Sequence, residues 1–348
     1  MNIGPQLPNS YTMMLALCEQ ELEEEPANAL SWSIRGYALV YLGRHEEALE
    51  SCEKALALDE NLSHAWYSLG LALIALSRNS DALNALDKAI ELDPEMAEAY
   101  YNRGLTLAAL GETNASLVAF NKAVNLKPDS AGAWANRGIS LAALGQYSEA
   151  LSSYDQALSL APRYAKAWSN RGILLAIMGK HEDALSSFER ALSLDPAVSA
   201  YWTNHGNILV AMMRYQDALS SFDRALELES GNTEALYNKS VALLKLERGS
   251  EALSVCDRAL ALRSDNGMYW CLRANVLRKL RRFTDASGSY KKALELDADN
   301  SQAWFGKGAI YYEHGDYLES LNCFQHALEL GLSQADKAVL LVLRKLQK

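Results

Sequence analysis

The sequence of 348 residues has few of the residues that break helices, crosslink chains or bind metals. It contains only seven prolines, six histidines and five cysteines, and no two cysteines form a C-x2-C pair. No His-x3-His or His-Glu ligand set occurs, so neither a zinc site nor a disulfide framework is predicted. No apolar run approaches the roughly 20 residues that a membrane-spanning helix needs. This cysteine usage is typical of a reducing cytosol, and we expect a cytoplasmic protein with no metal and no membrane insertion.

Basic residues are also in the minority, with 33 Lys and Arg against 43 Asp and Glu. A chain with this balance repels polyanions, so nucleic acid is not expected as a partner. The charge is uneven, because residues 1–60 carry eleven acids and three bases whereas residues 239–348 carry thirteen acids and seventeen bases. Such a gradient either orients a partner or reflects ordinary solvated helix faces, and the sequence leaves both readings open.

The sequence is dominated by a unit of 34 residues, which is clearest in residues 131–164. Each half of the unit spaces its apolar residues along one face of a helix, so two antiparallel helices are predicted. A glycine inside a helix costs roughly 1 kcal/mol relative to alanine, so Gly138 needs a packing reason. We expect it to let the two backbones approach opposite Ala150 and Ala157, with Trp134 and Tyr154 filling the space at either side.

The period can be followed along the chain by counting in steps of 34 from Gly138. The glycine recurs in most units, and only Ser240 and Ala274 interrupt the series: Gly36, Gly70, Gly104, Gly172, Gly206 and Gly308. All seven tryptophans lie four residues before these positions: Trp32, Trp66, Trp134, Trp168, Trp202, Trp270 and Trp304. An alanine of the second helix is present in every unit: Ala55, Ala89, Ala123, Ala157, Ala191, Ala225, Ala259, Ala293 and Ala327.

These residues resemble the tetratricopeptide repeat, whose signature is W-x2-L-G-x2-Y followed by A-x3-F, A and P. Arginine often precedes the glycine, as in Arg103, Arg137 and Arg171. This Asn-Arg-Gly pattern resembles that of many bacterial and archaeal members of the family. The resemblance covers residues 29–334. It implies an all-α fold, a right-handed superhelix or α-solenoid of nine helix-turn-helix repeats whose first helices line a concave groove.

The period predicts three segments. Residues 1–28 hold a disordered lead (1–9) and a half-repeat helix (10–25), and residues 335–348 form a capping helix. In that helix Val339, Leu340, Leu343 and Leu346 are expected to face inward, opposite Arg344, Lys345 and Lys348. The nine predicted repeats are 29–62, 63–96, 97–130, 131–164, 165–198, 199–232, 233–266, 267–300 and 301–334.

The pattern loosens in the later repeats. The glycine between the helices is replaced by Met213, Glu247 and Arg281, and the turn proline is replaced by Ser230, Ser264 and Ala298. Relaxed packing and a specialised surface are the two explanations that the sequence allows.

No arrangement of residues typical of catalysis is present. Carboxylates such as Glu149, Asp155 and Asp223 recur with the repeat as surface residues, and no apolar setting is predicted to tune them. The chain also lacks a glycine-rich phosphate loop and a nucleophile elbow. We therefore expect no enzymatic activity and no cofactor.

The resemblance implies that positions 2, 5, 6, 9, 12 and 13 of each repeat face the groove. Position 6 is asparagine in five successive repeats: Asn102, Asn136, Asn170, Asn204 and Asn238. An amide has one acceptor and two donors, so this Asn ladder can pair with the backbone of an extended peptide. It is similar to the ladder in the repeats of protein O-GlcNAc transferase. The alternative is that each asparagine bonds a neighbouring repeat.

Further along the groove the residues become polar and basic, which would suit a carboxylate or an acidic segment. These residues are Asn207, Lys245, Asn275, Arg278 and Lys279. A clamp for chaperone C-termini is not expected, because Thr203, Met268 and Leu272 stand where the resemblance requires lysine and arginine.

Three functions follow from this sequence. The first is a scaffold that binds protein or peptide segments along the Asn ladder. The second is a substrate-recruiting arm of, or partner to, a glycosyltransferase that resembles O-GlcNAc transferase. The third is a structural array formed by self-association.

Overall fold

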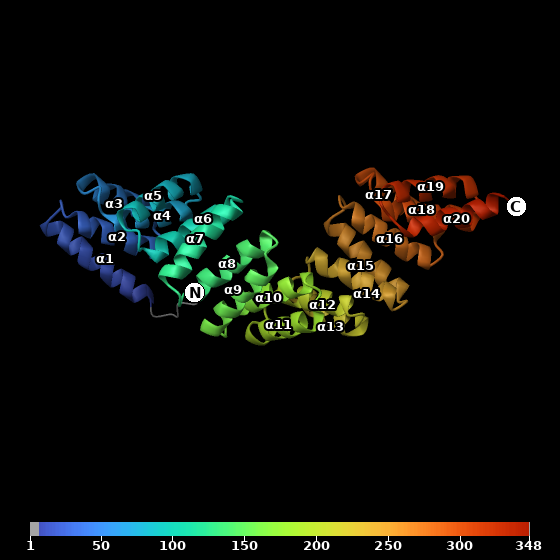
Figure 1. Ribbon diagram of the computed structural model, residues 1–348, viewed down its shortest axis with the longest axis horizontal. Helices are drawn as coiled ribbons and strands as arrows, with labels where there is room; N and C mark the ends of the chain where they lie inside the picture. Colours follow the sequence, from blue (N-terminus) through green and yellow to red (C-terminus); the bar gives the residue numbers. More distant parts are fainter. Residues whose placement is uncertain (1–6, 348) are drawn as a thin grey trace. The chain divides into compact units, whose positions relative to one another are not determined.

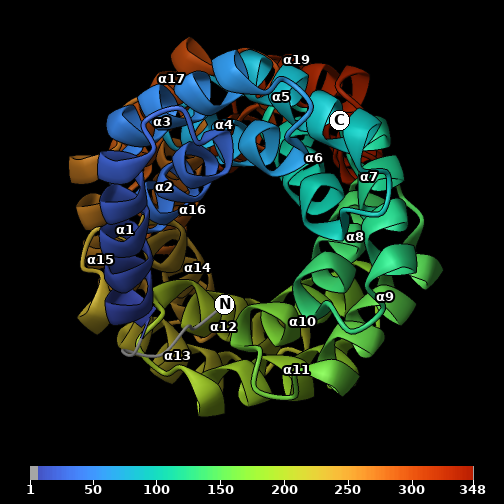
Figure 2. The ribbon, with the colours of Figure 1, turned by 90° about the vertical axis from the view of Figure 1, so that its left-hand side faces the viewer.

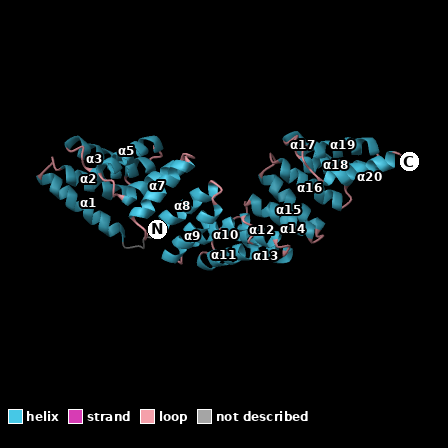
Figure 3. Ribbon diagram, viewed as in Figure 1, coloured by secondary structure: helices cyan, strands magenta, loops and turns pink. Residues whose placement is uncertain are grey.

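The computed structural model describes residues 7–347, and every regular element in this range is a helix (Figure 3). The all-helical prediction is thereby confirmed. The helices are α1 (Leu7–Glu24), α2 (Ala29–Tyr41), α3 (His45–Leu58), α4 (Ser63–Ala75), α5 (Asn79–Leu92), α6 (Ala97–Ala109), α7 (Thr113–Leu126), α8 (Ala131–Ala143), α9 (Tyr147–Leu160), α10 (Ala165–Ile177), α11 (His181–Leu194), α12 (Ser199–Ala211), α13 (Tyr215–Leu228), α14 (Thr233–Lys245), α15 (Gly249–Leu262), α16 (Gly267–Lys279), α17 (Phe283–Leu296), α18 (Ser301–His314), α19 (Tyr317–Glu329) and α20 (Gln334–Leu346) (Figure 1).

The helices belong to two compact units, one ending at Met178 and the other beginning at Gly179. Within each unit, consecutive helices pack as hairpins, such as α2 with α3 and α12 with α13. The first helices of successive hairpins also touch, in the order α2, α4, α6, α8 and α10 in one unit and α12, α14, α16 and α18 in the other. Figure 2 shows α2, α4, α6 and α8 on the inner side of the first unit and α3, α5, α7 and α9 on its outer side. Each unit therefore presents a surface made of first helices.

Four helical glycines of the 34-residue series make room for an aromatic ring, whereas Gly36 and Gly70 face the Cys52 and Leu86 side chains. A Cβ atom built on Gly138 would lie 2.8 Å from a ring carbon of Tyr154, closer than real contacts allow. The predicted place for Tyr154, beside the glycine, is therefore wrong, since its ring lies directly on Gly138. Trp134 is half-buried, with the Arg137 guanidinium 5.5 Å above its ring. The same pairing of a glycine with a ring recurs in Gly104 with Phe120, Gly206 with Phe222 and Gly308 with Phe324.

The repeat with Ala274 in place of glycine accommodates its aromatic ring in a different way. Its ring, Tyr290, is fully buried, and it lies against Gly306 of the next hairpin, where an added Cβ would overlap the ring and its hydroxyl. The hydroxyl donates to the Asn275 side-chain oxygen at 2.6 Å. Gly306 stands at the repeat position that carries the Asn ladder in earlier repeats, and the Tyr290 ring takes the space in which a side chain at this position would begin.

The turns between paired helices keep one backbone geometry whatever residue occupies them. Gly145 has φ 75°, in the left-handed region that glycine adopts without strain. Met213, Glu247 and Arg281 have φ of 60°, 59° and 59°. The change of residue therefore leaves the turn geometry intact, at the cost of backbone strain.

Replacing Glu247 with glycine is expected to raise the free energy of unfolding of the second unit by about 1 kcal/mol, because a non-glycine residue in the left-handed region costs about that much. Glu247 is exposed, so little else is lost. A urea titration followed by circular dichroism measures the change. The control is Ser254→Gly at an exposed site inside α15, which should lower stability by about 0.5 kcal/mol. A loss of stability in Glu247→Gly would contradict the assigned strain.

The tryptophans tie each first helix to the turn before it. Every indole N–H donates to the backbone carbonyl six residues earlier, at 2.8–3.0 Å: Trp32, Trp66, Trp134, Trp168, Trp202, Trp270 and Trp304. The acceptor is proline in four cases, but Ser264 and Ala298 accept equally well. Because the acceptor is a backbone atom, loss of the proline leaves this contact intact.

The two end helices differ from expectation. Helix α1 begins at Leu7 and not near residue 10, with Pro8 in its first turn, where proline is tolerated. The rest of the predicted disordered lead, residues 1–6, lies outside the described residues. In α20, Ala335 and Val342 are buried. The predicted inward face is wrong for three of its leucines, because Leu340, Leu343 and Leu346 are exposed.

Candidate functional site

The Asn ladder begins in the first unit, on the inner helices α6 and α8. The Asn102 amide donates to the Tyr67 hydroxyl at 3.1 Å and to the Glu98 carbonyl at 2.9 Å. Asn136 repeats this pattern with the Tyr101 hydroxyl at 3.3 Å and the Gly132 carbonyl at 2.8 Å. The alternative of bonds to the neighbouring repeat is confirmed for these two residues. Their N–H groups are used within the protein, which leaves the amide oxygens as the groups able to meet a ligand.

Asn170 lies on α10 in the first unit and Asn204 on α12 in the second. Both are half-buried, and neither side chain forms a hydrogen bond with another described residue. These two amides therefore keep both their donors and their acceptor, unlike Asn102 and Asn136.

In the second unit the ladder continues as a chain of amides. The Asn238 amide donates to the Asn207 oxygen at 2.8 Å, and the Asn207 amide donates to the Glu234 carboxylate at 2.9 Å. The structure thus brings together two predicted groove residues, Asn207 from α12 and Asn238 from α14.

The predicted basic residues lie at the ends of α14 and α16. Lys245 is the last residue of α14 and is exposed, while Arg278 and Lys279 end α16. Asn275, one turn before Lys279, accepts from Tyr290 and is not free. No ion pair joins Lys245, Arg278 or Lys279 to a described carboxylate, and the Arg278 Nε is buried without a hydrogen-bond partner. The three cations lie near helix C-termini, where the helix dipole favours them; Lys245 and Lys279 are exposed, while Arg278 also interacts with Tyr290.

An apolar strip runs beside the ladder in the first unit. Ile139 on α8 is 39 % exposed, and Ile173 and Ile177 on α10 are 40 % and 59 % exposed. Exposed branched side chains on adjacent inner helices provide the kind of surface on which a peptide can dock.

A tyrosine cluster adjoins the ladder and was not anticipated as a site. Tyr11 stacks on Tyr41 with ring centroids 4.6 Å apart, and Tyr37 lies 4.9 Å from Tyr41. Burial is the main reason that the pKa of Tyr37 rises to about 12, so the cluster stays protonated at neutral pH. Tyr37, Tyr41 and Tyr67 occupy groove positions 9, 13 and 5 of their repeats, which is the signal that could have identified them.

A series of ion pairs joins the base at position 7 of several repeats to an acid on the second helix of the preceding repeat. Arg103 bonds Asp87 at 2.6 Å and Arg273 bonds Asp257 at 2.7 Å. His205 stands at this repeat position without forming an ion pair there; its Nδ1 lies 2.8 Å from the Ser221 hydroxyl. The series of ion pairs is therefore interrupted at His205. Burial lowers the pKa of His205, which favours the neutral ring. A hollow of about 430 Å³ opens at this interruption.

Metal binding, disulfide formation and membrane insertion would each require particular side chains or helices among the described residues. No group of three or more His, Cys, Asp or Glu side chains in residues 7–347 is placed to hold a metal ion. All five cysteines are free and buried, and burial raises the pKa of the Cys52 thiol to about 12. None of the helices described is long and apolar enough to cross a membrane.

Family models described as tetratricopeptide repeats match most of the chain. One matches residues 136–199, 203–267 and 271–335, which together exceed half of the sequence. Others match residues 29–62, 71–111 and 97–130. Among curated proteins no sequence matches the chain significantly.

Solved structures support the same fold. A tetratricopeptide repeat protein from Parabacteroides merdae is 17 % identical, with a TM-score of 0.58 over 71 % of this chain and 98 % of that one. Cut9–Hcn1 of the APC/C is 18 % identical, with a TM-score of 0.58 over 90 % of this chain and 63 % of that one. Yeast Tom70 is 15 % identical, with a TM-score of 0.50 over 97 % of this chain and 93 % of that one. From the family models and the helical hairpins, we conclude that the chain belongs to the tetratricopeptide repeat family.

Proposed function

We propose that the protein is a non-catalytic scaffold that holds an extended peptide segment of a partner protein against its inner helices. The observation that carries this proposal is the state of the ladder amides. Bonds to Tyr67 and Tyr101 fix the Asn102 and Asn136 side chains, while no described residue donates to their oxygens. Fixed acceptors cost little entropy to engage, so they suit the N–H groups of an extended backbone.

The apolar strip supports the same arrangement. Ile139, Ile173 and Ile177 lie on the helices that carry Asn136 and Asn170, so a bound segment would bury aliphatic surface beside its backbone bonds. Backbone bonds provide affinity without reading side chains, and pockets for alternate side chains provide specificity.

The second unit favours an acidic segment. Lys245, Arg278 and Lys279 have no carboxylate partner among the described residues, and cations are well suited to bind carboxylates when both are partly desolvated. Changing all three to glutamine should weaken capture of acidic partners and flatten its dependence on salt.

The test is capture of partners from the source extract by the intact protein and by a variant with Asn136, Asn170 and Asn204 changed to alanine. The matched control changes Asn84, Asn114 and Asn322, which are exposed on second helices. Circular dichroism first establishes that all three proteins fold equally. We expect the control to retain partners that the ladder variant loses. Identical captures by all three proteins would assign the ladder a purely structural role.

Self-association is a second candidate, favoured by one observation. Helix α20 exposes Leu340, Leu341, Leu343 and Leu346 at 38–51 %. An apolar face of this kind is typical of an interface. Sedimentation velocity at increasing protein concentration tests it, since a sedimentation coefficient independent of concentration excludes assembly.

The recruiting-arm alternative rests on the resemblance of the ladder to the repeats of O-GlcNAc transferase. It requires the same groove, together with a glycosyltransferase that co-purifies with the protein. The five free buried thiols suit a reducing compartment, and a cytoplasmic location is part of this proposal.

A further inference from the structure

Three leucine positions of the repeat are all altered at one place in the chain. Counting each repeat from its first residue, position 11 is leucine in eight repeats and Tyr311 in the ninth. Position 14 is leucine or methionine in eight repeats and His314 in the ninth. Position 21 is leucine in eight repeats and Ser287 in the remaining one. Each change replaces an apolar side chain with one that forms hydrogen bonds.

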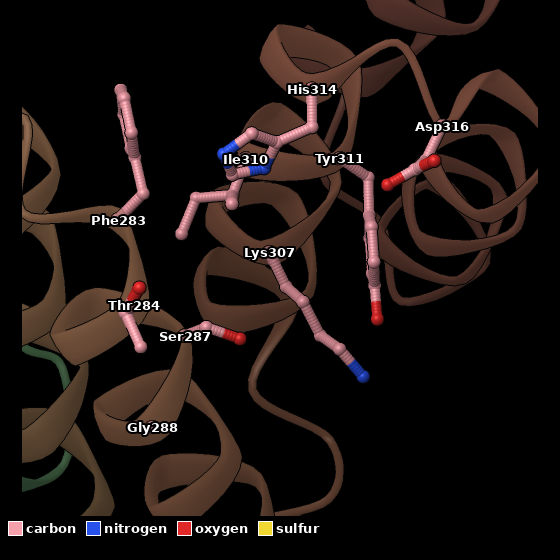
Figure 4. Close-up of a pocket in the computed structure, with 9 residues that line it drawn as sticks. All are labelled: Phe283, Thr284, Ser287, Gly288, Lys307, Ile310, Tyr311, His314 and Asp316. Carbon is pink, nitrogen blue, oxygen red and sulfur yellow. The ribbon is translucent and has the colours of Figure 1, made fainter.

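The three altered side chains line a single hollow of about 310 Å³ between α17 and α18. Phe283, Thr284 and Ser287 come from α17 and its start, and Lys307, Ile310, Tyr311 and His314 come from α18; Gly288 and Asp316 complete the lining. Figure 4 shows the α17 side chains facing those of α18 across the hollow. Changes that belong to two different repeats in the sequence are thus gathered at one site.

Part of the hollow corresponds to the repeat position at which a leucine packs in other repeats. Leu117 and Leu151 occupy position 21 in other repeats, where they pack on the core formed by Leu141, Tyr154 and Leu174. Ser287 is too short to make this contact. The following residue is Gly288, and a Cβ atom added to it would meet nothing within 4 Å. Removing a leucine side chain from a packed interface leaves a cavity when the neighbours do not collapse into it.

The charge at this place is also altered. The basic residue before the helical glycine pairs with an acid on the preceding helix, as Arg171 pairs with Asp155. Before Gly308 the base is Lys307, and the corresponding residue of the preceding helix is Lys291. Among residues 7–347 no carboxylate pairs with Lys307, whose ammonium lies over the rings of Trp304 and Tyr311 at 5.4 Å and 5.8 Å. Lys307 therefore lines the hollow without forming an ion pair with any described carboxylate.

These groups define the chemistry of an occupant. Lys307, Ser287, Thr284 and Tyr311 can all donate hydrogen bonds, which suits a carboxylate. Phe283 and Ile310 offer apolar walls for the rest of the molecule. Asp316 also lines the hollow, and its negative charge disfavours a ligand with two or more negative charges, such as a phosphate. Pockets of roughly 300 Å³ and larger with apolar walls and a few polar groups are typical of small-molecule sites.

We propose that the hollow between α17 and α18 binds a small monocarboxylic acid with an apolar or aromatic body. The carboxylate meets Lys307 and the hydroxyls, and the body takes the place of the missing leucine. This site is formed by different residues from the inner-helix ladder, and it does not depend on peptide binding there.

The experiment titrates the full chain with 3-phenylpropionate and follows binding by ligand-observed NMR. The neutral isostere 3-phenylpropionamide tests the need for charge, and acetate tests the need for an apolar body. We expect 3-phenylpropionate to bind at least about tenfold more tightly than either probe, because the amide lacks the charge-assisted hydrogen bonds and acetate lacks the apolar body. No binding of 3-phenylpropionate, or equal binding of the amide, would overturn the proposal.

Two variants locate the site. Lys307→Gln should weaken binding about tenfold. Its matched control is Lys239→Gln, which alters the same repeat position where the lysine pairs with Asp223. Ser287→Leu restores the leucine of the other repeats and should abolish binding while preserving helix content. Undiminished binding in Lys307→Gln would refute the assignment, whether or not Ser287→Leu folds.

Discussion

Phe222→Ala is expected to lower the free energy of unfolding of the second unit by about 3–5 kcal/mol, the range for removing a buried phenylalanine. Phe222 is 0 % exposed and its ring fills the space above Gly206. Alanine would leave a cavity between α12 and α13, and the neighbouring glycine has no side chain with which to fill it. Urea and thermal titrations followed by circular dichroism measure the loss.

A matched control distinguishes this packing effect from a general effect of truncation. Met268 belongs to the same unit and is 54 % exposed, so Met268→Ala should cost less than about 1 kcal/mol. Equal losses in the two variants would show that Phe222 does not act through burial.

Gly206→Ala is expected to lower the free energy of unfolding as well, although alanine favours a helix over glycine by about 1 kcal/mol. An added Cβ would lie 2.5 Å from a ring carbon of Phe222, so the ring must move or the helices must separate. Overpacking costs about 1–3 kcal/mol, and we expect a net loss of about 1–2 kcal/mol. Gly288 is the control, since an added Cβ there meets nothing within 4 Å and alanine should stabilise α17 by up to about 1 kcal/mol.

Combining the two substitutions gives a decisive result. In a chain that already carries Phe222→Ala, the ring is absent, so Gly206→Ala should become neutral or stabilising. The coupling free energy measured by this double-mutant cycle should be at least about 1 kcal/mol. If the losses of stability from Phe222→Ala and Gly206→Ala are additive, the role assigned to Gly206, to accommodate the Phe222 ring, is wrong.

The all-helical fold could be predicted from the sequence because the repeat period is carried by residues whose role is local. Gly145 ends a helix, and Ala157 is small enough for a close helix contact. The fold could therefore be predicted without knowing which side chains are in contact. The partner of each helical glycine was not accessible, because Tyr154 belongs to the other helix of the hairpin from Gly138 and its direction depends on both helices.

The departures from the period were harder to interpret. Ala274 interrupts the glycine series, and the Tyr290 ring of the same repeat packs on Gly306 of the next repeat instead. This contact joins positions that the repeat period does not relate to one another. The leucines of α20 were expected to face inward because they form an apolar stripe on one side of the helix. An amphipathic pattern identifies such a stripe but does not show which side of the helix packs against the rest of the protein. In the structure Ala335 and Val342 face the core instead.

The candidate site was predictable in part. The positions of Asn102 and Asn136 could be derived from the period, but the use of their N–H groups depends on Tyr67 and Tyr101 in the preceding repeat. The hollow at Ser287 corresponds to a feature of the sequence, because Ser287, Tyr311 and His314 replace the apolar residues that other repeats carry at these positions. That feature becomes meaningful only when the structure shows the three residues around one space.

The indole bonds to the turns also give the protein a set of built-in optical reporters. Each tryptophan sits at one place in one repeat, half-buried, with its N–H held by a backbone carbonyl. Local fraying of a turn would release that N–H to water and shift the emission of that tryptophan to longer wavelength. Single-tryptophan versions that keep Trp134 or Trp202 would therefore record how far each unit opens independently of the other.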